Sequence, residues 1–128
     1  MILSDAVAAY LADFGTYHSP FSVAAYQPPL RLLAAHLGAD ADVTSLTDDA
    51  WIGALRALAH KCSRGNFVVR QAALLGLCGY LLREGTTTPP VERLREIGKA
   101  LAGPLSKRSP VVPKDADVDR LTDALYQI

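Results

Sequence analysis

The sequence has few of the residues that mark a catalytic or metal-binding protein. Only three histidines occur (His18, His36 and His60), none four positions from another, and no glycine-rich phosphate-binding motif is present. The acidic residues are scattered over expected helix starts and loops, where they complement helix dipoles and aid solubility. We therefore expect no enzyme activity, no metal, no cofactor and no small-molecule substrate.

Cysteines and long apolar runs are also scarce. Cys62 and Cys78 lack CxxC spacing and are too few for a disulfide framework, so we expect free thiols, with Cys78 in the core, and a reducing, cytoplasmic location. The longest nearly unbroken apolar run, Ala72–Leu82, is shorter than the roughly 20 residues that span a bilayer. The N-terminus carries an early aspartate and no basic residue, unlike a signal peptide, so no membrane partner is expected.

Helix-forming residues dominate, and no stretch alternates apolar and polar residues with the period of two typical of a strand. Half of the residues are hydrophobic, which suffices for one packed core in a chain of 128 residues. We predict an all-α fold, with a compact bundle of four to five helices over residues 1–105. A linker and a short extra helix are expected over residues 106–128.

Caps and apolar periodicity predict where the helices lie. Ser4, Thr47 and Asn66 are expected as N-caps, and Pro90 as the first residue of a helix. The Pro28-Pro29 pair should kink or split the second helix. The expected helices cover residues 4–14, 22–37, 47 onward, 67–83, 90–102 and 115–126.

The fourth of these helices is apolar on most sides and should be the central one, in contact with the other main helices. The residues expected to be largely buried are Tyr26, Leu30, Trp51, Leu55, Leu74 and Leu81.

Charge is unevenly distributed along a chain whose net charge is zero. Residues 1–53 carry a net charge of −5, residues 54–108 a net charge of +7, and residues 109–128 a net charge of −2. Lys61, Arg64 and Arg70 flank a helix N-terminus that Ser63 or Asn66 would cap, and cations at a helix N-terminus bind phosphate. The alternative is that these residues only keep an apolar helix pair soluble.

The order of motifs resembles a known family. Ser19-Pro20-Phe21-Ser22 precedes Tyr26, Leu30 and Leu33, and Leu46-Thr47 precedes Leu55 and Leu58. Ser63, Asn66, Arg70 and Leu74 are followed by Tyr80-Leu81 and Glu84-Gly85. This series is similar to the N-terminal, SAM-like core-binding domain of tyrosine recombinases, the phage-integrase family. One departure is Leu75, which stands where that family often has a basic residue.

The resemblance implies a domain that clamps duplex DNA as part of a site-specific recombinase or integrase. The family's catalytic residues belong to a later domain that these 128 residues lack. The expected partner is duplex DNA, and homo-oligomerisation on DNA is left open. The residues predicted to contact DNA are Ser22, Lys61, Arg64, Asn66, Arg70, Lys107 and Arg108.

A second resemblance points to a different class of protein. Val69-Arg70-Gln71-Ala72-Ala73, followed by Leu77, resembles the second helix of a HEAT-type repeat, with the Trp51–Ala59 segment as its partner helix. That reading predicts a helical module that binds other proteins. The pattern has no second copy in the chain, whereas such solenoids need about three repeats to bury a core.

Overall fold

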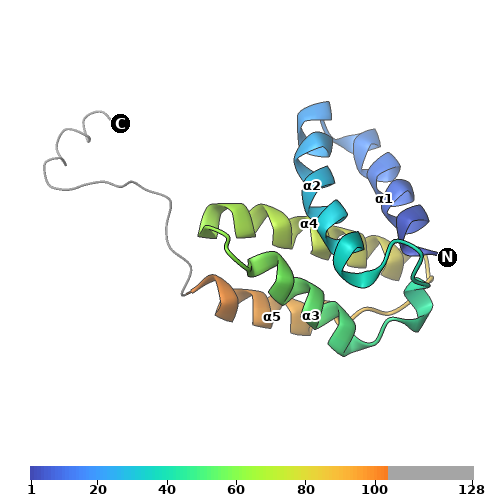
Figure 1. Cartoon of the computed structure of the whole chain (residues 1–128). Coiled ribbons are helices and arrows are strands. Elements are labelled where there is room, and N and C mark those ends of the chain that lie inside the picture. The colour runs from blue at the N-terminus through green and yellow to red at the C-terminus, as the bar shows by residue number, and fades with distance from the viewer. Residues whose placement is uncertain (104–128) are drawn as a thin grey trace, which may run out of the picture.

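The computed structural model describes residues 1–103, which form five α-helices and one short 3-10 helix (Figure 1). The only β pairing in this range is an isolated bridge between Ile2 and Asp42. The predicted all-α bundle is confirmed, while the expected helix at 115–126 lies outside the described residues. The elements are α1 (Leu3–Tyr17), α2 (Pro20–Leu37), η1 (Val43–Ser45), α3 (Asp48–Ala59), α4 (Arg64–Arg83) and α5 (Val91–Ala102).

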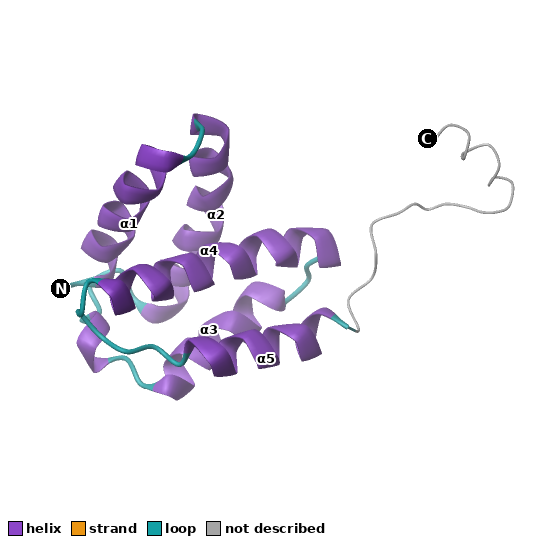
Figure 2. Ribbon diagram, turned by 180° about the vertical axis from the view of Figure 1, so that it is seen from behind, coloured by secondary structure: helices purple, strands orange, loops and turns teal. Residues whose placement is uncertain are grey.

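Helix α4 runs through the middle of the bundle and contacts all four other α-helices (Figure 2). The hairpin of α1 and α2 lies along one side of α4, and the pair α3 and α5 lies along the other. The prediction that the fourth helix is central is therefore confirmed. In length and composition α4 would also suit a membrane span, the one such helix among residues 1–103, but a central core helix meets the same criteria.

The core forms where these helices meet around α4. Leu74, Leu77 and Leu81 of α4 are fully buried, and they belong to the same cluster as Trp51 of α3 and Leu94 of α5. Five of the six residues expected to be buried are buried; both cysteines are free thiols and Cys78 lies in the core, as predicted, and Cys62 is buried as well. The exception is Tyr26, which is only partly buried because its ring stacks on Phe14 at the edge of the core, with ring centroids 4.6 Å apart.

Two expected helix caps are not used: tertiary contacts take the place of Ser4, and Ser63, the alternative to Asn66, caps α4. Ser4 is not the N-cap of α1, which begins at Leu3. The amides of Leu3 and Ser4 instead donate to the carbonyl oxygens of Ala41 and Ala39, at 2.7 Å and 2.9 Å. Asn66 is not the N-cap of α4 either, since the helix begins at Arg64 and the Ser63 hydroxyl accepts from the Asn66 amide at 3.3 Å.

The remaining boundaries differ by a few residues. Thr47 caps α3 as expected, with its hydroxyl 3.1 Å from the Ala50 amide. Pro90 is the N-cap of α5 rather than its first residue. Pro28 and Pro29 do not split α2, which is one helix of 18 residues. Because α2 packs against α1, α3 and α4, its tertiary contacts offset the hydrogen bonds that two prolines cannot donate.

Two glycines of α4 have opposite surroundings. A Cβ at Gly76 would lie 2.8 Å from Cζ of Tyr10 and would overlap the phenol oxygen, so α1 and α4 pack closely only because residue 76 has no side chain. A Cβ at Gly79 would meet no atom within 4 Å. Nothing within residues 1–103 therefore requires a glycine at position 79.

The central place of α4 predicts a large cost for truncating its buried face. Leu74→Ala should lower the free energy of unfolding by about 2–5 kcal/mol, because it leaves a cavity on a fully buried helix face. Leu32→Ala, at a side chain that is 46% exposed, is the matched control and should cost much less. Urea denaturation measures both, and a Leu74→Ala variant as stable as wild type would contradict the central packing of α4.

The glycine pair gives a second test. Gly76→Ala should destabilise the protein by about 1–3 kcal/mol, because the methyl group collides with Tyr10. Gly79→Ala should instead stabilise it by about 0.5–1 kcal/mol, because alanine is the better helix former and meets no neighbour. Thermal melts at low protein concentration compare the two, and equal effects would show that α1 does not pack against Gly76.

Candidate nucleic-acid interface

Three helix ends meet on one side of the molecule. The C-termini of α3 and α5 lie beside the N-terminus of α4, at the left-hand end of the bundle in Figure 1. Two arginine side chains join these ends. They are Arg64 and Arg70, both of which the sequence placed in the predicted DNA-binding set.

Arg64 is the first residue of α4 and bonds to the end of α5. Its Nε donates to the carbonyl oxygen of Ala102 at 3.2 Å, and its Nη2 donates to that of Gly103 at 2.9 Å. The last carbonyls of a helix have no partner within the helix and carry the negative end of its dipole. The Arg64 guanidinium satisfies both of these carbonyls.

Arg70 makes the corresponding contact with α3. Its Nη1 donates to the carbonyl oxygen of Leu58 at 2.9 Å. Both arginines are therefore half-buried structural links as well as cations. The carbonyl groups they bond are neutral, and within residues 1–103 each guanidinium has N–H donors, of its set of five, that no hydrogen bond uses.

Three further cations belong to the same helix ends and the turn between them. Lys61 lies in the turn between α3 and α4, with its backbone in the left-handed region at φ 48°. Arg56 lies in the last turn of α3 and Lys99 in the last turn of α5, and all three side chains are exposed. We refer to Arg56, Lys61, Arg64, Arg70 and Lys99 as the basic end. Sequence reasoning missed Arg56 and Lys99, although a cation in the last turn of a helix is a recognisable signal.

In residues 1–103 the carboxylate nearest in sequence to the basic end is Glu96, three positions before Lys99 on α5, and no ion pair joins the two. Residues 50–83 and 97–103 contain neither aspartate nor glutamate. The ion pairs of the described chain join Asp42 to the N-terminus, Asp13 to Arg83 and Glu92 to Arg95, so none involves a residue of the basic end. Four aspartates lie instead in the segment that leads into α3, at the opposite end of that helix: Asp40, Asp42, Asp48 and Asp49.

The other predicted contacts fall in different places. Asn66 is exposed in the first turn of α4, beside the basic end. Ser22 is in the first turn of α2, with its hydroxyl 3.3 Å from that of Ser19, and Figures 1 and 2 place this helix end away from the basic end. The structure does not bring Ser22 together with the other residues. Lys107 and Arg108 lie outside the described residues.

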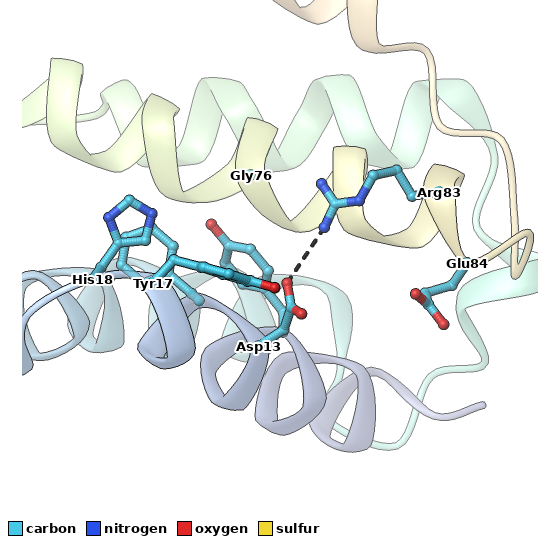
Figure 3. Close-up of a pocket in the computed structure, with 8 residues that line it drawn as sticks. Asp13, Tyr17, His18, Gly76, Arg83 and Glu84 are labelled. Carbon is cyan, nitrogen blue, oxygen red and sulfur yellow. Dashed lines mark hydrogen bonds and ion pairs between the residues drawn. The ribbon is translucent and has the colours of Figure 1, made fainter.

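A cleft of about 420 Å³ lies between α1 and the C-terminal half of α4 (Figure 3). An ion pair closes one side, with Nη2 of Arg83 at 3.4 Å from Oδ2 of Asp13. On the other side the His18 ring stacks on Phe14, with centroids 3.9 Å apart. The residues that line the cleft are Tyr10, Asp13, Phe14, Tyr17, His18, Gly76, Arg83 and Glu84.

Two ionisable side chains of the core, Tyr10 and Cys78, stay in their neutral forms. Burial raises the pKa of Tyr10 to about 12, so its phenol stays protonated at neutral pH. Burial likewise raises the pKa of Cys78 to about 12, which keeps that thiol from acting as a nucleophile. Among residues 1–103, no three histidine, cysteine or acidic side chains gather as metal ligands would.

Comparison with protein-family models, with curated proteins and with solved structures gave no match to this chain. The likeness to recombinase core-binding domains therefore rests on the sequence motifs alone. The fold and the basic end stand on the geometry described above.

The structural role of Arg70 can be separated from its charge. Arg70→Met should lower the free energy of unfolding by about 1–3 kcal/mol, because the Leu58 carbonyl loses a charged donor. Lys61→Met removes an exposed cation and should change stability by less than about 0.5 kcal/mol. Denaturant titrations compare them, and an Arg70→Met variant no less stable than Lys61→Met would exclude the link to α3.

Proposed function

We propose that this domain binds the phosphate backbone of duplex DNA through the basic end. The observation that supports the proposal is a group of five cations at three converging helix ends, none of which forms an ion pair within residues 1–103. The likeness of the sequence to core-binding domains points to the same class of ligand. No catalytic step is part of the proposal.

The chemistry of the cluster suits phosphate. The N-terminus of α4 presents the positive end of its dipole on the same side as Lys61 and Arg64. The half-buried guanidinium groups are held in place by backbone carbonyls, so less side-chain entropy is lost when their free N–H groups meet a phosphate oxygen. Arg56, Lys61 and Lys99 are exposed and add charge around this fixed centre.

Affinity should be modest and depend strongly on salt, because each neutralised phosphate adds about −0.9 to the slope of log K against log salt. Replacing Arg56, Lys61 and Lys99 by Gln should weaken binding to any duplex and make that slope less steep by up to about three units. These side chains make no hydrogen bond within the described chain, so folding should be preserved. Fluorescence anisotropy with labelled duplexes at several salt concentrations measures the effect.

The matched control removes three positive charges elsewhere. Arg31, Arg93 and Arg95 are exposed and lie outside the basic end, so replacing them by Gln changes the net charge equally. This control should keep most of the affinity and the salt slope. If both triple variants lose binding to the same extent, the protein binds DNA through general charge and not through this surface. If wild type binds no duplex at low salt, the proposal fails.

A protein-interaction module is the second candidate, and the uncharged outer face of α4 favours it. Val68, Val69 and Leu82 are exposed there, at 57%, 39% and 47%. The described helices enclose α4 in a bundle, however, whereas in a solenoid each repeat contacts only its neighbours. The bundle therefore does not support a HEAT-type module, and a partner for this face would bind it in another way.

A further inference from the structure

The outer face of α4 carries an apolar stripe along the helix. We refer to Val68, Ala72, Leu75, Gly79 and Leu82 as the α4 stripe. These residues follow one another at spacings of four, three, four and three, so they lie on one side of the helix. None is fully buried, and Val68 and Leu82 at the two ends are large and exposed.

Gly79 is the feature of the stripe that the single chain does not explain. Glycine within a helix costs about 0.5–1 kcal/mol relative to alanine. At Gly76 the cost is explained by the contact with Tyr10, but a side chain at Gly79 would enter open space. A glycine on an exposed helix face suits the close approach of another backbone.

We propose that the α4 stripe is the contact surface for a second copy of this chain, with the two α4 helices packed antiparallel. The stripe is self-complementary about Leu75. A two-fold axis there sets Val68 of each copy opposite Leu82 of the other, while the small residues Ala72 and Gly79 let the helices approach. The spacing of seven from Val68 to Leu75 to Leu82 keeps such a seam facing its partner.

Charge selects the antiparallel orientation and argues for a second copy as the partner. The N-terminus of α4 adjoins the basic end, whereas exposed Glu84 follows its C-terminus, where Arg83 and Asp13 neutralise each other. Antiparallel packing places the basic end of each copy toward Glu84 of the other and opposes the two helix dipoles. Parallel packing would bring two basic ends together. This inference does not depend on DNA binding.

The contact involves one helix face, so we expect a weak dimer that forms at roughly micromolar to millimolar concentration. Sedimentation equilibrium of the full chain in moderate salt measures the dissociation constant. Gly79→Leu should weaken the dimer by about tenfold or more, because the larger side chain keeps the helices apart. If the stripe associated only through non-specific apolar contact, Gly79→Leu would strengthen the dimer, and that result would overturn the proposal.

A charge-pairing series tests the orientation. Val68→Lys and Leu82→Glu should each weaken association by about tenfold or more, because each places a charge in an apolar seam. The double variant V68K/L82E should recover most of the loss, since lysine of one copy then meets glutamate of the other. A double variant weaker than both single variants would exclude the antiparallel register.

Folding of every variant is checked by circular dichroism melts at a concentration where wild type is monomeric. Nuclear magnetic resonance on wild type needs no substitution. On dilution, the shifts that change should be those of the α4 stripe and its flanking residues. Wild type that stays monomeric at about 1 mM, or shifts confined to another surface, would overturn the proposal.

Discussion

The structure depends on the burial of one helix that has little polar surface of its own. Helix α4 places Phe67, Leu74, Leu77 and Leu81 in the core, and these side chains are fully buried. An isolated helix of this composition would expose them to water, so the other helices pack against the side of α4 that carries them. Tyr10 of α1 lies so close to Gly76 of α4 that a side chain at position 76 would collide with it.

The helices that pack against α4 end in backbone carbonyl groups that have no hydrogen-bond partner within their own helix. At one end of the bundle the C-termini of α3 and α5 stop beside the N-terminus of α4. Arg64 and Arg70 reach across and donate to the carbonyls of these neighbours. The same two side chains thereby hold the three helix ends together and concentrate positive charge where they meet, so stability and the proposed phosphate contact depend on the same arginines.

The basic end and the α4 stripe involve different parts of α4. The basic end lies at its N-terminus, and the α4 stripe runs along the face that the other helices leave open. Leu75 stands in the middle of the stripe, where a cation would have interrupted it. Its apolar side chain makes the outer face of α4 suited to apolar contact.

The sequence by itself determined the helical class, the order of the helices and the central place of α4. These features depend on local periodicity and on an apolar content that no other segment matches. It also marked Lys61, Arg64 and Arg70 as a charged group, because they are close along the chain. Only the tertiary structure decided that the carbonyls of Ala39 and Ala41 accept from the amides of Ser4 and Leu3 at the start of α1, so that Ser4 is not an N-cap. It also added Arg56 and Lys99 to the basic end and separated Ser22 from it. Those outcomes arise from contacts between residues distant in the chain, and no local pattern encodes which helix ends will meet.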